Sequence, residues 1–158
     1  MKQLLNDAKA LRTLRKTPVI LKAVLAGITP EQARTLRDGA DGWSILFIVC
    51  HLRDVELMFS GRVRDMLEKT NPEFKVVTNE DMIQQNDYEG ASFERALFDY
   101  YDHRTAFITL LESLSDEQWL LPGTHPLQGP ATVLDVAVNT GLHDIDHIEQ
   151  IIRCVNAG

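Results

Sequence analysis

The stretch SILFIVCHLRDVELMFSGRVRDMLEK, residues 44–69, decides the fold of this chain. Its apolar residues recur at the spacing of an α-helix, and Ser44 is of the type that caps a helix N-terminus. Asn71-Pro72 ends the segment, because the residue before a proline avoids the helical conformation. We therefore predict one long helix over residues 44–69.

Two further long helices are predicted downstream of this one. Ser92 is a predicted N-cap for the third helix, and apolar residues follow it at helical spacing. Thr132 and Asp135 have the spacing of a capping box, and the last helix extends from there to about Val155. The stripe on the third helix consists of Phe93, Ala96, Tyr100, His103, Phe107, Leu110 and Leu114.

The N-terminal part of the chain leaves two alternatives open. Apolar residues recur at helical spacing over residues 4–14, and Thr17-Pro18 then has the pattern of a new helix start. A second segment over residues 19–26 stops at Gly27. This part therefore forms either two helices or one kinked helix.

The connections between these segments complete the fold prediction. Residues 70–91 are polar and lack a clear period, and so long a connection in a small domain is functional or a crossover. Ser115 and Gln118 predict one short capped turn, and residues 121–130 form a second irregular loop. No convincing set of alternating strands is present. We predict a single all-α domain over residues 1–158, a four-helix bundle with one long crossover and extra short helical turns.

Composition and charge exclude several classes of protein. Of 158 residues, 44% are hydrophobic and 25% charged, which is typical of a globular domain and excludes intrinsic disorder. The formal net charge of −7 argues against nucleic acid or an anionic membrane as the main partner. The longest apolar run, residues 45–50, is far too short to span a membrane, and no signal peptide precedes it. Cys50 and Cys154 lie in apolar runs as reduced thiols, so we expect a cytoplasmic protein.

The five histidines are the candidate functional residues. His143 and His147 are four residues apart on the predicted last helix, so both imidazoles can reach one cation. Gln150 is close enough to orient a ligand or a bound water, whereas Cys154 lies about 10 Å beyond His147 along the helix, too far to share the ion.

A third ligand is needed, and the spacing alone leaves His51 and His103 as rivals for it. His125, in the loop before the last helix, either hangs over the site or is exposed. Asp144 and Asp146 flank the pair, either as solvated carboxylates or as groups that orient the ligands.

The order and spacing of short motifs over nearly the whole chain resemble those of the DinB-like (YfiT-like) metal-binding four-helix bundles. One departure is Phe47, where many members of the family have a glutamate. The motifs are Thr17-Pro18 with Leu21, Trp43-Ser44, His51-Leu52 with Glu56, His125-Pro126 with Gly129, and His143-Asp144 with His147 and Gln150.

The resemblance implies an up-down-down-up bundle, often a homodimer, with a three-histidine metal site of His51, His143 and His147. Related families include bacillithiol transferases and mycothiol-dependent maleylpyruvate isomerase, which use low-molecular-weight thiols. By analogy, the substrate here is a small molecule, such as a low-molecular-weight thiol, that a divalent metal presents to an electrophile.

Three histidines leave at least one position of the metal open, which suits catalysis better than a structural role. Zinc or nickel fits imidazole ligands, with iron or manganese as alternatives. Asp54, one turn from His51, and His125 are weak candidates for a general base, and residues 70–91 with Tyr88 could form a wall or lid. The alternatives are a metal-dependent hydrolase and a non-catalytic, metal-stabilised bundle acting as a binding or stress-response protein.

Two further patterns concern partners. The last helix carries a second apolar stripe opposite its histidines, which either packs on the N-terminal helix or forms a symmetric dimer contact. Arg104, on the third helix, is expected to pair with a carboxylate of the bundle rather than with substrate. The stripe consists of Leu134, Val138, Ile145 and Ile152, and a basic cluster expected on a solvated helix face consists of Lys2, Lys9, Arg12, Arg15 and Lys16.

Overall fold

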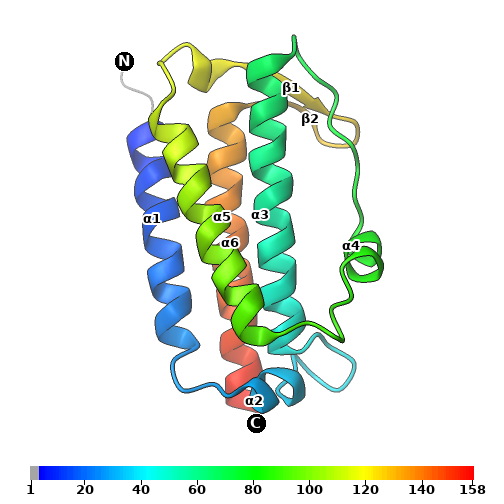
Figure 1. Cartoon of the computed structure of the whole chain (residues 1–158). Helices are drawn as coiled ribbons and strands as arrows, with labels where there is room; N and C mark the ends of the chain where they lie inside the picture. The colour runs from blue at the N-terminus through cyan, green and yellow to red at the C-terminus, as the bar shows by residue number, and fades with distance from the viewer. Residues whose placement is uncertain (1–3) are drawn as a thin grey trace.

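The computed structural model describes residues 4–158, and its four long helices form an all-α bundle (Figure 1). α1 and α6 pack side by side, and α3 packs against both α5 and α6. α1 and α6 run in one direction while α3 and α5 run in the other, which is the predicted up-down-down-up order (Figure 1). The long helices are α1 (Asp7–Val24), α3 (Ile45–Glu68), α5 (Phe93–Glu112) and α6 (Val133–Ala157).

α1 is one helix, which decides between the two alternatives for the N-terminal part. Pro18 lies inside it and has no N–H to donate to the Leu14 carbonyl one turn earlier. The buried Arg104 of α5 fills that gap, because its Nη1 donates to Leu14 O over 3.1 Å. Thr17 is therefore not an N-cap, and its hydroxyl donates instead to Asp144 of α6. Lys2, one residue of the expected basic cluster, lies outside the described residues.

Short elements connect the long helices. α2 (Pro30–Thr35) begins with a capping box and leads into the turn before α3. The crossover from α3 to α5 runs along the outside of α3 and contains α4 (Asn79–Gln85) (Figure 1). The predicted capping box of Ser115 and Gln118 is present and is followed by a 3-10 turn over Gln118–Leu120.

The second irregular loop contains a β-hairpin that the sequence analysis did not predict. β1 (Pro122–His125) pairs antiparallel with β2 (Gly129–Thr132) at one end of the bundle. The strands are four residues long and include Pro122 and Pro130, so their alternation was too short to detect. Phe74 N donates to Thr124 O over 2.8 Å, which ties the crossover to the hairpin.

The centre of the bundle holds a buried ion network as well as apolar side chains. Arg104 forms two 2.7 Å hydrogen bonds to Glu56 and a 2.8 Å ion pair with Asp144. Tyr100 also donates to Asp144. All four long helices contribute to this network, so it fixes their relative positions. The predicted pairing of Arg104 is confirmed, whereas Asp144 is 1% exposed and is not a solvated carboxylate.

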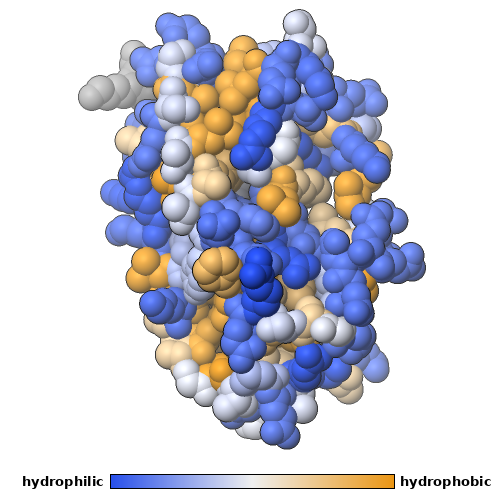
Figure 2. Space-filling view, viewed as in Figure 1, coloured by the Kyte–Doolittle hydropathy of each residue, from blue (hydrophilic) through white to orange (hydrophobic). Residues whose placement is uncertain are grey.

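None of the described helices is long and apolar enough to cross a membrane. The face visible in Figure 2 is mostly hydrophilic, with apolar side chains gathered in separate patches.

Candidate metal centre

Three histidines from two helices converge at one point inside the bundle. His51 of α3 and His143 of α6 place their Nε2 atoms 3.0 Å apart, and the Nε2 atoms of His143 and His147 are 3.2 Å apart. One ligand atom from each of the three lies within 4.8 Å of the other two. His51, His143 and His147, hereafter the three-His cluster, could therefore hold one metal ion.

The local sequence explains why these side chains meet. His143 and His147 are one helical turn apart on α6, so their rings project to the same side. His51 is 4% exposed because it lies on the face of α3 that packs against α6. The third ligand position thus depends on the packing of α3 against α6.

The nitrogen spacing and the proton positions of the cluster are better suited to binding a metal ion than to hydrogen bonds among the three imidazoles alone. His147 Nδ1 lies 2.8 Å from Gln150 Oε1, an acceptor, so Nδ1 holds the proton and Nε2 presents a lone pair. A single proton on His143 Nε2 cannot form well-aligned hydrogen bonds to nitrogens on both sides. A cation accepts all three lone pairs at once, and nitrogens around a tetrahedral zinc ion are about 3.3 Å apart, close to the observed spacing.

The cluster is neutral at pH 7, which is the form that binds metals. Burial lowers the pKa of His51 to about 4 and that of His143 to about 3, with a further contribution from the neighbouring imidazoles. Burial also lowers the pKa of His147. The lone pairs are therefore available to a cation without prior loss of a proton.

A chain of polar contacts orients His147 from outside. Gln150 accepts from His147 Nδ1 and donates from Nε2 to Asp38 Oδ2 over 3.2 Å. Asp38 in turn accepts 2.8 and 3.0 Å hydrogen bonds from Arg153. Sequence reasoning found Gln150 by its helical spacing, but it missed Asp38, since no spacing rule links a turn residue to a helix 112 positions away.

Aromatic side chains enclose the rings of the cluster. Trp43 stacks on His147 at 6.3 Å between ring centroids and meets His51 edge-on at 5.1 Å. Phe59 contacts the His143 ring edge-on at 5.8 Å. These contacts limit ring rotation, so the Nε2 atoms stay directed at one another.

The cluster opens onto a cavity of about 360 Å³, hereafter the cluster cavity. His125 and Gln128 of the hairpin region border it, which places His125 over the site. His125 Nδ1 accepts from the backbone N–H groups of Leu127 and Gln128, so the neutral ring carries its proton on Nε2. The cavity is lined by His51, Val55, Met58, Phe59, Arg62, Val77, Asn79, Met82, His125, Gln128, Asn139, His143 and His147, without a carboxylate among them.

The remaining sequence candidates lie elsewhere. Asp54 accepts from Asn86 and Tyr88, so it holds the crossover against α3 and does not line the cavity. Tyr88 is 1% exposed and packs edge-on against Phe47, which makes it a fixed wall of the crossover. His103, the rival third ligand, lies outside the cluster.

The remaining acid and thiol candidates also lie outside the cluster. Cys154 lies beneath Trp43 with its sulfur 3.9 Å from the Trp43 carbonyl oxygen, and Asp146 is exposed.

Comparisons with known proteins identify the fold and the family. The structure is similar to that of YfiT from Bacillus subtilis, described as a probable metal-dependent hydrolase with an unusual four-helix bundle topology. The TM-score is 0.88, at 20% identity over 99% of this chain and 91% of that chain. TT2238, described as a four-helix bundle protein, matches with a TM-score of 0.66 and 18% identity over 93% of this chain and 98% of its own. The comparison with curated proteins gave no match.

The family itself follows from the sequence match. At these identities the two solved structures show a shared fold and nothing finer. The family model of the DinB superfamily, however, matches residues 13–151, which is most of the chain. The chain therefore belongs to the DinB superfamily.

Proposed function

We propose that this protein is a metal-dependent enzyme that transfers a low-molecular-weight thiol to a small electrophile. The supporting observation is that imidazole nitrogens of the buried His51 and the half-buried His143 and His147 converge beside a cavity whose described lining contains no carboxylate. Hydrolysis usually relies on a general base that takes a proton from water. A thiol loses its proton far more readily than water, so a site without a carboxylate base suits a thiol nucleophile better.

The proposed reaction conserves atoms and electrons. The thiol loses its proton to solvent, the sulfur forms a bond to an electrophilic carbon, and the leaving group departs with the electron pair of the broken bond. A divalent cation bound by the three-His cluster supplies Lewis acidity, which lowers the pKa of a thiol that reaches it. Zinc or nickel suits this set of ligands, with iron or manganese as alternatives.

The residues of the chain then have separate tasks. The three-His cluster binds the cation, and Gln150 fixes the proton of His147 on Nδ1. His125 Nε2–H is a hydrogen-bond donor at the border of the same cavity, where a substrate oxygen or a leaving group could accept it. Val55, Met58 and Met82 form an apolar part of the cavity wall, which an apolar portion of the substrate could contact.

Two alternatives remain. The first is metal-dependent hydrolysis, the activity in the description of YfiT, whose fold this chain shares. The second is a metal-stabilised bundle without catalysis, because a cation that joins α3 to α6 also stabilises the fold.

Metal content tests the site. Purified protein should contain close to one divalent ion per chain by elemental analysis, and His143→Ala should lose it. His103→Ala is the matched control, since this histidine lies outside the cluster, and it should retain the ion. Equal metal content in the wild type and His143→Ala would show that the three-His cluster is not the metal site.

Turnover then separates the three functions. The transferase should consume an electrophile such as 1-chloro-2,4-dinitrobenzene only with added thiol and bound metal. Ester or amide cleavage without thiol would favour the hydrolase. A metal-dependent rise in melting temperature with neither activity would favour the non-catalytic bundle.

A further inference from the structure

Arg62 is a cationic side chain that forms no ion pair within the described residues. It lies eleven residues after His51 on α3, three helical turns further on and on the same face. Its Nε is buried and has no hydrogen-bond partner, and no carboxylate within residues 4–158 forms an ion pair with it. The side chain is half-buried, so a guanidinium that is partly withdrawn from water without an opposite charge is available to bind an anionic ligand.

Arg104 is a buried arginine with a structural role, and carboxylates balance the charge of its guanidinium. Burial disfavours its charge, but the two hydrogen bonds that it donates to Glu56 and the negative charges of Glu56 and Asp144 raise its pKa overall. Burial lowers the pKa of Arg62, and no carboxylate opposes the effect. The two arginines therefore differ in whether a carboxylate of the described chain balances the charge of the guanidinium.

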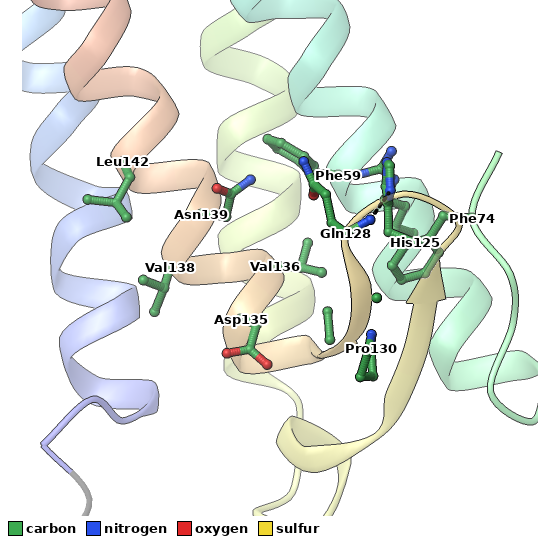
Figure 3. A pocket seen from close by; sticks show the side chains of 13 residues that line it. Phe59, Phe74, His125, Gln128, Pro130, Asp135, Val136, Val138, Asn139 and Leu142 are labelled. Atoms are coloured by element: carbon green, nitrogen blue, oxygen red, sulfur yellow. Dashed lines mark hydrogen bonds between the residues drawn. The ribbon is translucent and has the colours of Figure 1, made fainter. Parts of the chain in front are cut away.

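Arg62 borders two neighbouring cavities. One is the cluster cavity, and the other, of about 340 Å³, lies between α3, α6 and the hairpin (Figure 3). Phe59, His125, Gln128 and Asn139 border both cavities as well. Among the described residues, Arg62 is the only Lys or Arg side chain that lines either of them.

The walls around Arg62 hold its guanidinium in place. Its Cζ lies 5.6 Å from the Phe59 ring centroid and 5.1 Å from that of Phe74, within cation–π distance. Figure 3 shows Phe59 and Phe74 on the same side of the second cavity as His125. Asp135 is the one carboxylate that lines that cavity, and its Oδ2 is occupied by the backbone N–H and hydroxyl of Thr132.

We propose that Arg62 binds the carboxylate of an elongated, partly apolar small molecule whose other end reaches the three-His cluster. One guanidinium balances one negative charge and matches the two oxygens of a carboxylate, whereas a phosphate dianion would need a second cation. The inference rests on the proposed function for the reacting end of the ligand and adds the chemical class of its other end.

The distance along α3 sets the length of this molecule. The Cα atoms of His51 and Arg62 are about 16 Å apart along the helix axis. Helical side chains lean toward the N-terminus, so the guanidinium lies nearer to the cluster than its Cα does. A ligand that reaches both ends therefore needs a chain of intermediate length, and a short one should bind at one end only.

The first experiment tests Arg62 without the metal. Hexanoate and its neutral analogue hexanamide are titrated into metal-free protein and followed by NMR. Wild type should prefer the carboxylate by about ten- to hundredfold, the usual effect of a charge-assisted hydrogen bond. Arg62→Gln should abolish this preference, and Arg62→Lys should retain only part of it. Inorganic phosphate should not displace hexanoate.

A matched control comes from the same helix. Arg64 lies two residues after Arg62 and its side chain is exposed. Arg64→Gln therefore removes a positive charge outside the cavities and should leave the carboxylate preference unchanged. Thermal melts should show that every variant is folded. An equal carboxylate preference in wild type and Arg62→Gln would overturn the inference, and so would displacement of hexanoate by phosphate.

The second experiment links Arg62 to the cluster. Cobalt-loaded protein is titrated with 3-mercaptopropionate, 6-mercaptohexanoate and 11-mercaptoundecanoate, each against the matching mercaptoalcohol, and thiolate binding is read from the absorption spectrum. The mercaptocarboxylate should bind more tightly than the matching mercaptoalcohol only for the two longer chains, and only in protein that retains Arg62. If no metal binds but hexanoate preference still depends on Arg62, the proposed function fails while the carboxylate site stands. If metal and thiols bind but the carboxylate makes no difference to binding, the carboxylate site fails while the proposed function stands.

Discussion

His147 shows what makes a single residue a candidate metal ligand. Its helical spacing from His143 makes shared binding feasible, but the direction of its lone pair depends on Gln150 and on the stacked ring of Trp43. The sequence pattern does not distinguish His51 from His103, because both lie on inward-facing stripes. The family resemblance favoured His51, and the packing of the helices places it in the cluster. Arg62 could have been found from its helical period with His51, whereas its lack of a partner could not.

Gln150→Ala should weaken metal binding without removing a ligand. The variant frees His147 Nδ1 from its acceptor, so the ring can rotate and its tautomer is no longer fixed. Loss of such a partner lowers metal affinity by about 10- to 100-fold, measurable by competition with a chelator dye. Gln85→Ala, on the exposed part of α4, is the control and should leave the affinity unchanged. An unchanged affinity in Gln150→Ala would contradict the orienting role.

The stability of the metal-free protein should fall as the pH drops below 6.5. The pKa values of His51 and His143 are lowered on folding to about 4 and about 3, mainly by burial, so in this range the unfolded chain binds more protons than the folded one. Each such histidine contributes a slope of up to about 1.4 kcal/mol per pH unit, and the contribution ends near the folded pKa.

Urea denaturation of the metal-free protein between pH 7 and pH 5.5 measures this slope, in a range where carboxylates contribute little. His143→Gln removes one of the titrating groups and should give a shallower slope. The same slope in both proteins would show that His143 is not held neutral by burial.

At the scale of elements, Pro18 and Arg104 explain how α1 joins the bundle. The proline leaves the Leu14 carbonyl free inside α1, and the guanidinium of α5 bonds to it while also bonding Glu56 of α3 and pairing with Asp144 of α6. The Thr17-Pro18 pattern predicted the start of a new helix at this point. The correct result, one continuous helix, follows because a partner from another element satisfies the freed carbonyl.

Glu56→Ala should destabilise the bundle strongly. It leaves Arg104, which is 2% exposed, without its two strongest hydrogen bonds. Breaking one side of a buried ion pair costs about 3–5 kcal/mol, measurable by urea denaturation. Asp99→Ala is the control, because it breaks a pair at the surface in which the Arg95 side chain is 71% exposed, and it should cost less than about 1 kcal/mol. Equal effects in the two variants would contradict a central role for the network.

At the scale of the whole molecule, the second apolar stripe of α6 is only partly covered. Leu134 and Val138 pack against the core, whereas Ile145 and Ile152 are 48% and 41% exposed, so contact with α1 does not account for the whole stripe. Leu142, 54% exposed, extends the exposed part. The exposed part of the stripe lies on one face of a single helix, which is compatible with a symmetric contact between two copies.

We therefore expect the protein to form a homodimer through α6. Ile145→Glu combined with Ile152→Glu places like charges on both sides of such a contact and should raise the dimer dissociation constant more than about tenfold. Light scattering over a range of concentrations measures this. Leu127→Glu, at an exposed position in the hairpin turn, is the control and should leave association unchanged. A monomer at every concentration would contradict the expectation.

The sequence by itself determined α3, α5 and α6, their N-caps and the spacing of His143 and His147, because helical periodicity and capping depend on residues close together in the chain. The tertiary structure decided that α1 is one helix, which histidine joins that pair, which residues pair with Asp144, and that Arg62 forms no ion pair within residues 4–158. The physical reason is that these properties depend on which atoms lie within a few ångströms across the packed helices. Residues 92 positions apart, such as His51 and His143, meet only when the whole bundle has formed.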